Sequence, residues 1–98
     1  MTTDRKKLEF EEITKAIIGS AFEVYNILGF GFLEKVYQRA MQVELLHRGY
    51  KAALEESIKV KYKGTIVGDY VADILVDNKV LVELKVAKKY NTKDEPQF

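Results

Sequence analysis

The chain has 98 residues, which is enough for one domain with a modest hydrophobic core and too few for two domains. Its 16 basic and 15 acidic residues leave a net charge of +1, which excludes a strongly basic protein that coats DNA, so any contact with nucleic acid must rely on a local patch. The lack of cysteine excludes disulfides, thiol nucleophiles and Cys-ligated zinc, and the single His47 cannot form a histidine-rich metal site alone. No stretch approaches the roughly 18 apolar residues of a membrane span, and we expect a cytoplasmic protein.

Two helices are predicted in the first half of the chain. Residues 1–9 are polar and we expect a frayed lead-in there. From Phe10 onward, apolar residues recur at helical spacing, at Ile13, Ile17, Ala21, Val24 and Leu28. Gly29 is a normal glycine for the end of this helix. A second helix is predicted from Phe32 to about Arg48, and its inward residues are expected to be Leu33, Val36, Tyr37, Ala40, Met41 and Val43.

After Gly49 the apolar period changes to two, which is typical of half-buried strands. In the first predicted strand, apolar residues alternate with lysines: Ile58, Lys59, Val60, Lys61, Tyr62 and Lys63. Two further strands are predicted at about Ile66–Val76 and Val80–Val86. The predicted fold class is α+β, with two N-terminal helices followed by a three-stranded antiparallel meander. The last strand is apolar on both faces, so we expect a further part of the fold or a partner chain to cover it.

Three charged side chains interrupt the apolar hairpin of residues 72–85. They are Asp73, Glu83 and Lys85. Glu83 and Lys85 share one face of their strand because they are two residues apart. Whether Asp73 shares that face depends on the loop between the two strands.

The register of the hairpin has two alternatives. A two-residue loop closed by Val76 and Lys79 points Asp73 away from Glu83, whereas a three-residue loop closed by Val76 and Val80 sets Asp73 directly opposite Glu83. We predict the three-residue loop, or a bulge of the same parity. The three charged residues then share one face of the hairpin and can act together at one site.

Two adjacent carboxylates repel each other unless a positive charge lies between them. A hard cation such as Mg²⁺ is held through one or two carboxylates and several waters, and the carbonyl of Leu84 is a further ligand candidate. Lys85 is placed to orient or deprotonate a water, or to stabilise the charge of a phosphorane. The simpler interpretation is a solvated salt-bridge ladder, and spacing alone favours it, because Asp73-x9-Glu83-x-Lys85 is a weak pattern.

The stretch DILVDNKVLVELK, residues 73–85, resembles the D…(D/E)xK core of the PD-(D/E)xK nuclease superfamily. Upstream, GFLEKVY, residues 31–37, resembles the G-x-x-E-x-x-Y signature of the GxxExxY protein family, and the resemblance covers about residues 10–98. It implies a partial restriction-endonuclease-like core with a metal site for Mg²⁺ or Mn²⁺.

The resemblance also assigns roles to individual residues. Asp73, Glu83 and Lys85 take the positions of the catalytic set, with Asp73, Glu83 and Glu34 as metal ligands. Gly31 and Tyr37 complete the upstream signature, and Gln97 resembles the glutamine that opens the next helix in relatives. That helix and the strands after it are not present here, so the resemblance implies a single truncated domain over residues 1–98. We therefore expect a homo-oligomer that covers the sheet.

Several of these residues have a second interpretation. Glu34 suits the first turn of any helix, where the macrodipole favours a negative charge by typically 0.3 to 1 kcal/mol. Tyr37 is expected to be a core aromatic whose hydroxyl has a polar partner. His47 suits the end of its helix better than a metal site, and the lysines at 59, 61 and 63 suit either phosphates or a solvated strand face.

The leading hypothesis is a Mg²⁺-dependent nuclease that hydrolyses phosphodiester bonds in nucleic acid. The alternative is a non-catalytic module on the same fold that binds nucleic acid or a partner protein. A third reading is a small α+β domain with a charge ladder on its surface. The acidic set, Asp73 and Glu83 with Lys85, favours the enzyme, whereas the missing C-terminal portion favours the binding module.

Overall fold

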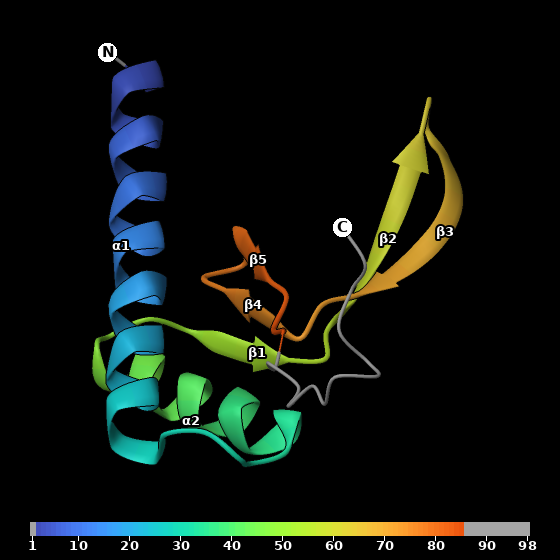
Figure 1. Ribbon diagram of the computed structural model, residues 1–98. Coiled ribbons are helices and arrows are strands. Elements are labelled where there is room, and N and C mark those ends of the chain that lie inside the picture. The colour runs from blue at the N-terminus through green and yellow to red at the C-terminus, as the bar shows by residue number, and fades with distance from the viewer. Residues whose placement is uncertain (1, 86–98) are drawn as a thin grey trace, which may run out of the picture.

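The computed structural model describes the backbone of residues 2–85 and the side chains of residues 5–85, so Gln97 and the expected Val86 end of the last strand lie outside the described residues. In the described part, two helices are followed by five short strands (Figure 1). Their bounds are α1 Thr2–Leu28, α2 Glu34–His47, β1 Ala52–Leu54, β2 Ser57–Tyr62, β3 Thr65–Val71, β4 Ile74–Val76 and β5 Val80–Val82. The predicted α+β class, with helices first and antiparallel strands after them, is confirmed.

Helix α1 begins at Thr2, so the expected frayed lead-in is wrong for residues 2–9. Residues 5–9 are Arg, Lys, Lys, Leu and Glu, which have high helix propensity and therefore extend an exposed helix without an apolar stripe. The helix ends at Leu28 as predicted. Gly29 follows with a φ of +69°, and its N–H donates to the Tyr25 carbonyl at 2.8 Å. Within residues 2–85, no helix is both long and apolar enough to cross a membrane.

Helix α2 begins at Glu34, two residues later than predicted. Its buried residues are Gln38, Met41 and Leu45. Several residues that were expected to face inward are exposed, namely Leu33, Val36 and Val43. The buried face of α2 is therefore rotated relative to the prediction, and it includes a polar side chain.

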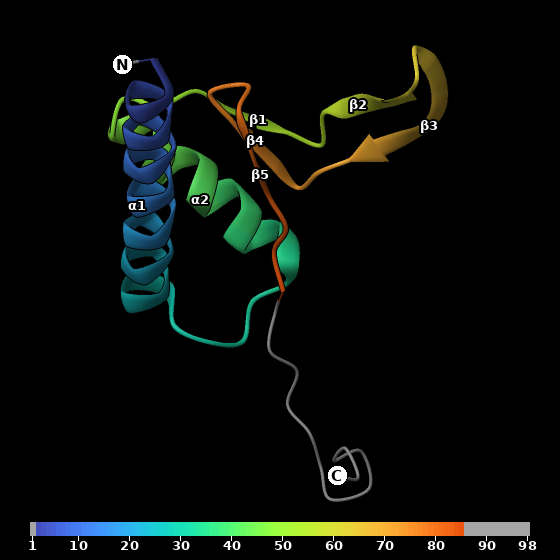
Figure 2. The same cartoon turned by 90° about the horizontal axis from the view of Figure 1, so that it is seen from above.

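The hydrophobic core lies where the two helices meet the sheet β1-β4-β5. Helix α1 lies against α2 and beside β5, while α2 lies beside β1 (Figures 1 and 2). The buried apolar residues that pack together there are Ile13, Ala16, Val24, Met41, Leu45, Ala52, Ile74 and Val76. Ile74 and Val76 alternate along the central strand β4 and are fully buried, so this face of the sheet is the core face. On the opposite face Leu81 is exposed.

The strands form two sheets, the three-stranded β1-β4-β5 and the two-stranded β2-β3, which meet at a bend, rather than the continuous meander that was predicted. The prediction lacks β1, and its strand over Ile66–Val76 is divided into β3 and β4 by Ala72–Asp73. On the neighbouring strand, Glu55–Glu56 separates β1 from β2, and Glu55 has a φ of +53°, which an extended strand does not tolerate. The pairing keeps one register across the bend, with Leu54 opposite Ile74 before it and Ser57 opposite Val71 after it.

The loop between β4 and β5 has the predicted length. Val76 pairs with Val80, so Asp77, Asn78 and Lys79 form a three-residue loop and the predicted register is confirmed. Asp77 and Asn78 have φ values of +51° and +57°, and Asp and Asn are the side chains that best tolerate this left-handed conformation. Strand β5 ends at Val82, earlier than predicted.

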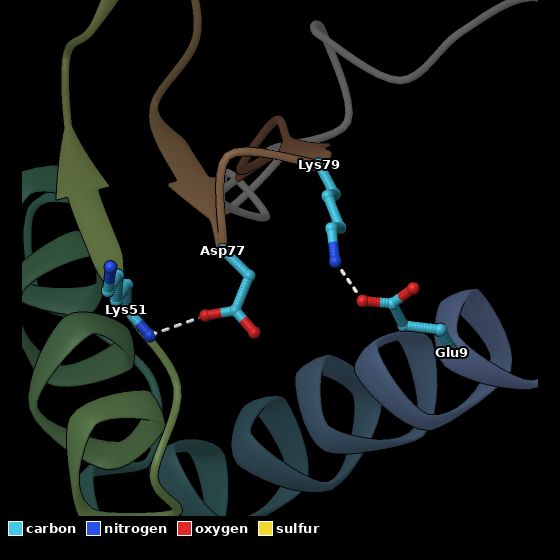
Figure 3. A network of polar contacts seen from close by, with 4 residues as sticks. All are labelled: Glu9, Lys51, Asp77 and Lys79. Atoms are coloured by element: carbon cyan, nitrogen blue, oxygen red, sulfur yellow. Dashed lines mark hydrogen bonds and ion pairs between the residues drawn. The ribbon is translucent and has the colours of Figure 1, made fainter. Parts of the chain in front are cut away.

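Three polar contacts fix this loop to the rest of the molecule (Figure 3). The Lys51 N–H donates to Asp77 Oδ1 at 2.7 Å, and the Asp77 N–H donates to the Lys51 carbonyl at 3.0 Å. On the other side, the Lys79 ammonium forms an ion pair with Glu9 of α1. The loop that sets the register is thus attached both to the start of β1 and to the N-terminal half of α1.

Candidate functional site

Asp73 lies in the bend between β3 and β4, and three other segments of the chain hold it. Its carbonyl accepts hydrogen bonds from Gln38 Nε2 of α2 at 2.9 Å and from the Glu55 N–H at 3.2 Å. Its carboxylate oxygen Oδ2 accepts the backbone N–H of Leu84 at 2.7 Å. The side chain of Asp73 therefore satisfies an N–H beyond the end of β5, which explains why the strand pairing stops at Ile74 and Val82.

Glu83 follows directly after β5. The register of β4 and β5, with Ile74 opposite Val82, brings Glu83 across from Asp73. Asp73 and Glu83 also act on a common neighbour, because the hydroxyl of Tyr70 donates a hydrogen bond to Glu83 Oε1. That hydrogen bond raises the pKa of Tyr70 above its usual value, and the negative charges of Glu83 and Asp73 add to the rise. The two carboxylates thus lie near one hydroxyl group.

Lys85, two residues after Glu83, lies on the other side of Leu84. Together with Leu84 it lines a cavity of about 270 Å³ beside the start of α2, where Gly31 and Tyr37 also line the wall. Within residues 5–85, no ion pair joins Lys85 to Asp73 or Glu83. The structure therefore places Lys85 next to the Gly31–Tyr37 segment, so that the two quoted sequence motifs meet in space.

The Gly31–Tyr37 segment forms a closed corner before α2. Gly31 has a φ of +106°, which favours glycine strongly. The hydroxyl of Tyr37 donates to the Gly29 carbonyl at 2.6 Å and accepts the N–H of Phe32 at 3.3 Å. The half-buried Tyr37 ring also packs edge-to-face on Phe32, with centroids 6.2 Å apart. The prediction that Tyr37 is a packed aromatic with a bonded hydroxyl is confirmed.

Glu34 is the first residue of α2 and is exposed. It lies four residues before Gln38, so the two side chains share one face of the helix, and Gln38 is the residue that bonds the Asp73 carbonyl. The described residues contain no group of three or more His, Asp or Glu side chains arranged to hold a metal ion. Glu34 therefore lies one helical turn from the Asp73 support without joining Asp73 and Glu83 in a three-ligand cluster.

The pair formed by Asp73 and Glu83 fits a hard divalent cation on chemical grounds. Mg²⁺ is commonly held through one or two carboxylates, and waters complete its shell. Each carboxylate uses one oxygen for a protein hydrogen bond, Oδ2 of Asp73 to Leu84 and Oε1 of Glu83 to Tyr70. The second oxygen of each has no hydrogen-bond partner within the described residues, which leaves two oxygen ligands of the type that Mg²⁺ prefers.

Two residues of this site were not predicted, Gln38 and Tyr70. Gln38 is a polar residue on the buried face of α2, and such a position is a sequence signal only when the buried face is assigned correctly. Tyr70 lies three residues before Asp73, which puts the two side chains on opposite faces of a regular strand. The bend at Ala72–Asp73 removes this alternation, and no local pattern marks it.

Comparison with known proteins gives one match. The family model of the PD-(D/E)XK nuclease superfamily matches residues 11–98, which include all the site residues described above. Neither a curated protein nor a solved structure matches the chain.

Proposed function

Because the chain belongs to the PD-(D/E)XK nuclease superfamily, we propose that it is a divalent-metal-dependent nuclease of the GxxExxY family, which hydrolyses phosphodiester bonds in nucleic acid. The observation that carries the proposal is the register of β4 and β5, which sets Asp73 across from Glu83 with Lys85 two residues further on. The corner at Gly31 and Tyr37 supports the family assignment, because both motif residues have a specific backbone task there.

Asp73 and Glu83 are the residues that would hold Mg²⁺ or Mn²⁺, with Glu34 contributing directly or through a water. When bound, such an ion supplies positive charge to the phosphate and makes a coordinated water more acidic. The hydrogen bond from the Leu84 N–H fixes the carboxylate of Asp73, and Gln38 fixes the backbone of the same residue. Tyr70 fixes Glu83 in the same way.

Lys85 has the chemistry for the attacking water or for the reacting phosphate. It orients or deprotonates the water, or its ammonium stabilises the additional negative charge that develops on the phosphate oxygens. The proton of the attacking water must leave toward a nearby base or solvent, and the leaving oxygen must gain one. A variant that removes the amine together with most of the side chain, Lys85→Ala, separates this role from metal binding.

Calorimetric titration with Mn²⁺ and Mg²⁺, paired with cleavage of a labelled oligonucleotide, tests the proposal. We expect weak metal binding that is lost in Asp73→Asn and in Glu83→Gln. Lys85→Ala should keep the binding and lose the cleavage. Glu12→Gln removes an exposed carboxylate of α1 and is the control for a general change of charge. Equal metal binding in the wild type, Asp73→Asn and Glu83→Gln rejects the proposed site.

A non-catalytic binding module on the same fold is the second candidate. One observation favours it: protein groups already bond both carboxylates, through the N–H of Leu84 and the hydroxyl of Tyr70. This candidate predicts binding of nucleic acid or a partner protein that is the same in EDTA and in Mn²⁺. Cleavage that requires Mn²⁺ or Mg²⁺ and is lost in Asp73→Asn decides in favour of the nuclease.

We also propose that the chain forms a homo-oligomer. The support is an exposed apolar stripe on α1, made of Ile18, Phe22 and Tyr25, which lie at helical spacing on one face. Single soluble chains rarely leave such a continuous stripe in water, and a straight helix offers the same stripe to a second copy. Light scattering at micromolar concentration should give a mass above 11.3 kDa that falls to the monomer in Phe22→Glu.

A further inference from the structure

The β2–β3 hairpin stands apart from the rest of the molecule. Figures 1 and 2, seen at right angles, both show it pointing away from the helices. Every residue of β3 is exposed, and Ile58 is the one residue of β2 that is half-buried. An isolated two-stranded hairpin is marginally stable in water at best. The hairpin is therefore a surface whose side chains are available for a ligand.

The two faces of the hairpin differ in chemistry. On β2, Ile58, Val60 and Tyr62 alternate with Lys59 and Lys61, so the lysines and the apolar residues point to opposite faces. Tyr70 is paired with Ile58 and therefore belongs to the apolar face, at the base of the hairpin. The face that carries Tyr62 near the tip is thus the face that carries Tyr70, whose hydroxyl bonds Glu83 of the acidic pair.

The charge of the hairpin is positive. Its residues 57–71 include three lysines and one aspartate, which leaves +2, although the whole chain carries only +1. Lys59 is paired with Asp69 across the strands at 2.6 Å. Lys61 and Lys63 have no ion pair within the described residues. Two positive charges without an acidic partner are therefore concentrated near the turn.

An exposed aromatic ring lies beside these charges. Tyr62 is 64% exposed, and the ammonium of Lys63 lies 5.5 Å from the centroid of its ring. A cation next to an exposed ring suits a single-stranded nucleic acid, since the phosphate meets the cation and a base stacks on the ring. Such stacking needs no particular base, because every base has a flat face. A second copy of the hairpin is disfavoured as the partner, because its lysines would repel those of the first.

The distance from the tip to the acidic pair suits a short piece of strand. Tyr62 is four residues from Ile58, which pairs with Tyr70, so the hairpin separates Tyr62 from Tyr70 by about 13 Å at roughly 3.3 Å per residue. We propose that the β2–β3 hairpin binds single-stranded nucleic acid along the unpaired outer edge of β2, with phosphates on Lys61 and Lys63 and a base on Tyr62, and directs the strand from this edge to Asp73 and Glu83. The delivery part rests on the proposed nuclease function, whereas the binding part does not.

Fluorescence anisotropy with a labelled single-stranded DNA of about 12 nucleotides, in EDTA, tests the binding without any metal chemistry. Lys61→Gln/Lys63→Gln removes the two charges and leaves polar side chains that are one atom shorter. The affinity falls as salt rises, with a slope of log K against log salt of about −0.7 for each phosphate contact. The double variant loses two contacts, so its slope should be shallower by about 1.4. Lys7→Gln/Lys15→Gln, which changes two exposed lysines of α1, is the matched control and should leave the slope unchanged.

The stacking role has its own variants. Tyr62→Ala should weaken binding by about 5- to 150-fold, which corresponds to the roughly 1–3 kcal/mol of one stacked base, and should leave the salt slope unchanged. Tyr62→Phe keeps the flat ring and should bind like the wild type. Circular dichroism and light scattering of each variant show whether the fold and the mass are intact. Loss of affinity that accompanies a change of mass overturns the proposal, because the hairpin then acts in assembly.

Four other results have a clear meaning. Equal slopes for the hairpin variant and the α1 control overturn the proposal. Tighter binding of duplex than of single strand overturns the stacking role of Tyr62. If the hairpin variants bind and cleave like the wild type, the proposed role of the hairpin is wrong and the proposed nuclease function stands. Binding that depends on Lys61 and Lys63, in a protein without metal binding at Asp73, supports the hairpin and rejects the nuclease.

Discussion

Gln38→Leu is the sharpest test of how the fold supports the site. The side chain of Gln38 is 6% exposed, and its Nε2 donates to the Asp73 carbonyl at 2.9 Å. Leucine keeps a similar volume and removes this hydrogen bond, whose net contribution is about 0.5–1.5 kcal/mol. The Asp73 carbonyl keeps its bond from the Glu55 N–H, so it is not left without a partner. We therefore expect a loss of about 1 kcal/mol, which lowers Tm by roughly 4–8 °C in a domain of this size.

Gln42→Leu is the matched control. Gln42 lies one turn further along α2, and its Nε2 donates to the Ala52 carbonyl of β1 at 3.0 Å, so the variant removes a hydrogen bond of the same kind away from Asp73. It also removes an exposed hydrogen bond that Gln42 Oε1 accepts from Arg39 at 3.2 Å, which is expected to contribute little in water. The two variants should have similar Tm values. Gln38→Leu alone should weaken Mn²⁺ binding, by about tenfold, which is the usual effect of removing support behind a metal ligand. Equal Mn²⁺ affinities in the two variants would refute a positioning role for Gln38.

Three further predictions concern neighbouring residues. Gly31→Ala forces a side chain into a φ of +106° and should destabilise by about 1–3 kcal/mol in thermal melts, whereas Gly68→Ala, which has open space and an ordinary φ, should not lower Tm. Tyr37→Phe loses the hydroxyl that bonds both ends of the corner before α2, and chemical denaturation should show a loss of about 1–2 kcal/mol with an unchanged m-value. Tyr70→Phe should lower stability below pH 10 and match the wild type at higher pH. The folded-state pKa of Tyr70 is raised, so its hydrogen bond to Glu83 stabilises the fold below the unfolded pKa and is lost as pH rises through the folded pKa; a gap that stays constant to high pH contradicts this.

The end of α1 and the register of the β4–β5 hairpin follow from local patterns, and for that reason they are predictable. Apolar spacing locates the end of α1 at Leu28, and Asp77-Asn78 offers the two residues that tolerate the left-handed turn conformation. The start of α1 is missed because a polar helix has no apolar stripe. The buried face of α2 is missed because Gln38 belongs to it, and a pattern of apolar residues alone shifts the face toward Val36 and Val43.

The bend at Asp73 is not predictable from a local pattern, because the contacts found there join residues that are distant in the sequence. A continuous strand over Ile66–Val76 would satisfy the alternation equally well. In the structure, the Asp73 carboxylate takes the N–H of Leu84, eleven residues away, and so ends the ladder between β4 and β5. Tyr70 reaches Glu83 across the same bend. Assigning side chains to the two faces of a regular strand therefore does not predict this contact.

Asp73 joins the fold and the candidate site in one residue. Its carbonyl is bonded by α2 and by the segment between β1 and β2, while its carboxylate is bonded by the chain after β5. A carboxylate in an unbroken ladder would lie beside backbone groups that already have partners. At the bend, by contrast, one carboxylate oxygen replaces a missing ladder bond, and the other has no hydrogen-bond partner within residues 5–85. The break in the sheet thus supplies both the rigid attachment and the oxygen that the proposed cation requires, since a hard cation binds best to oxygens that are held in place before it arrives.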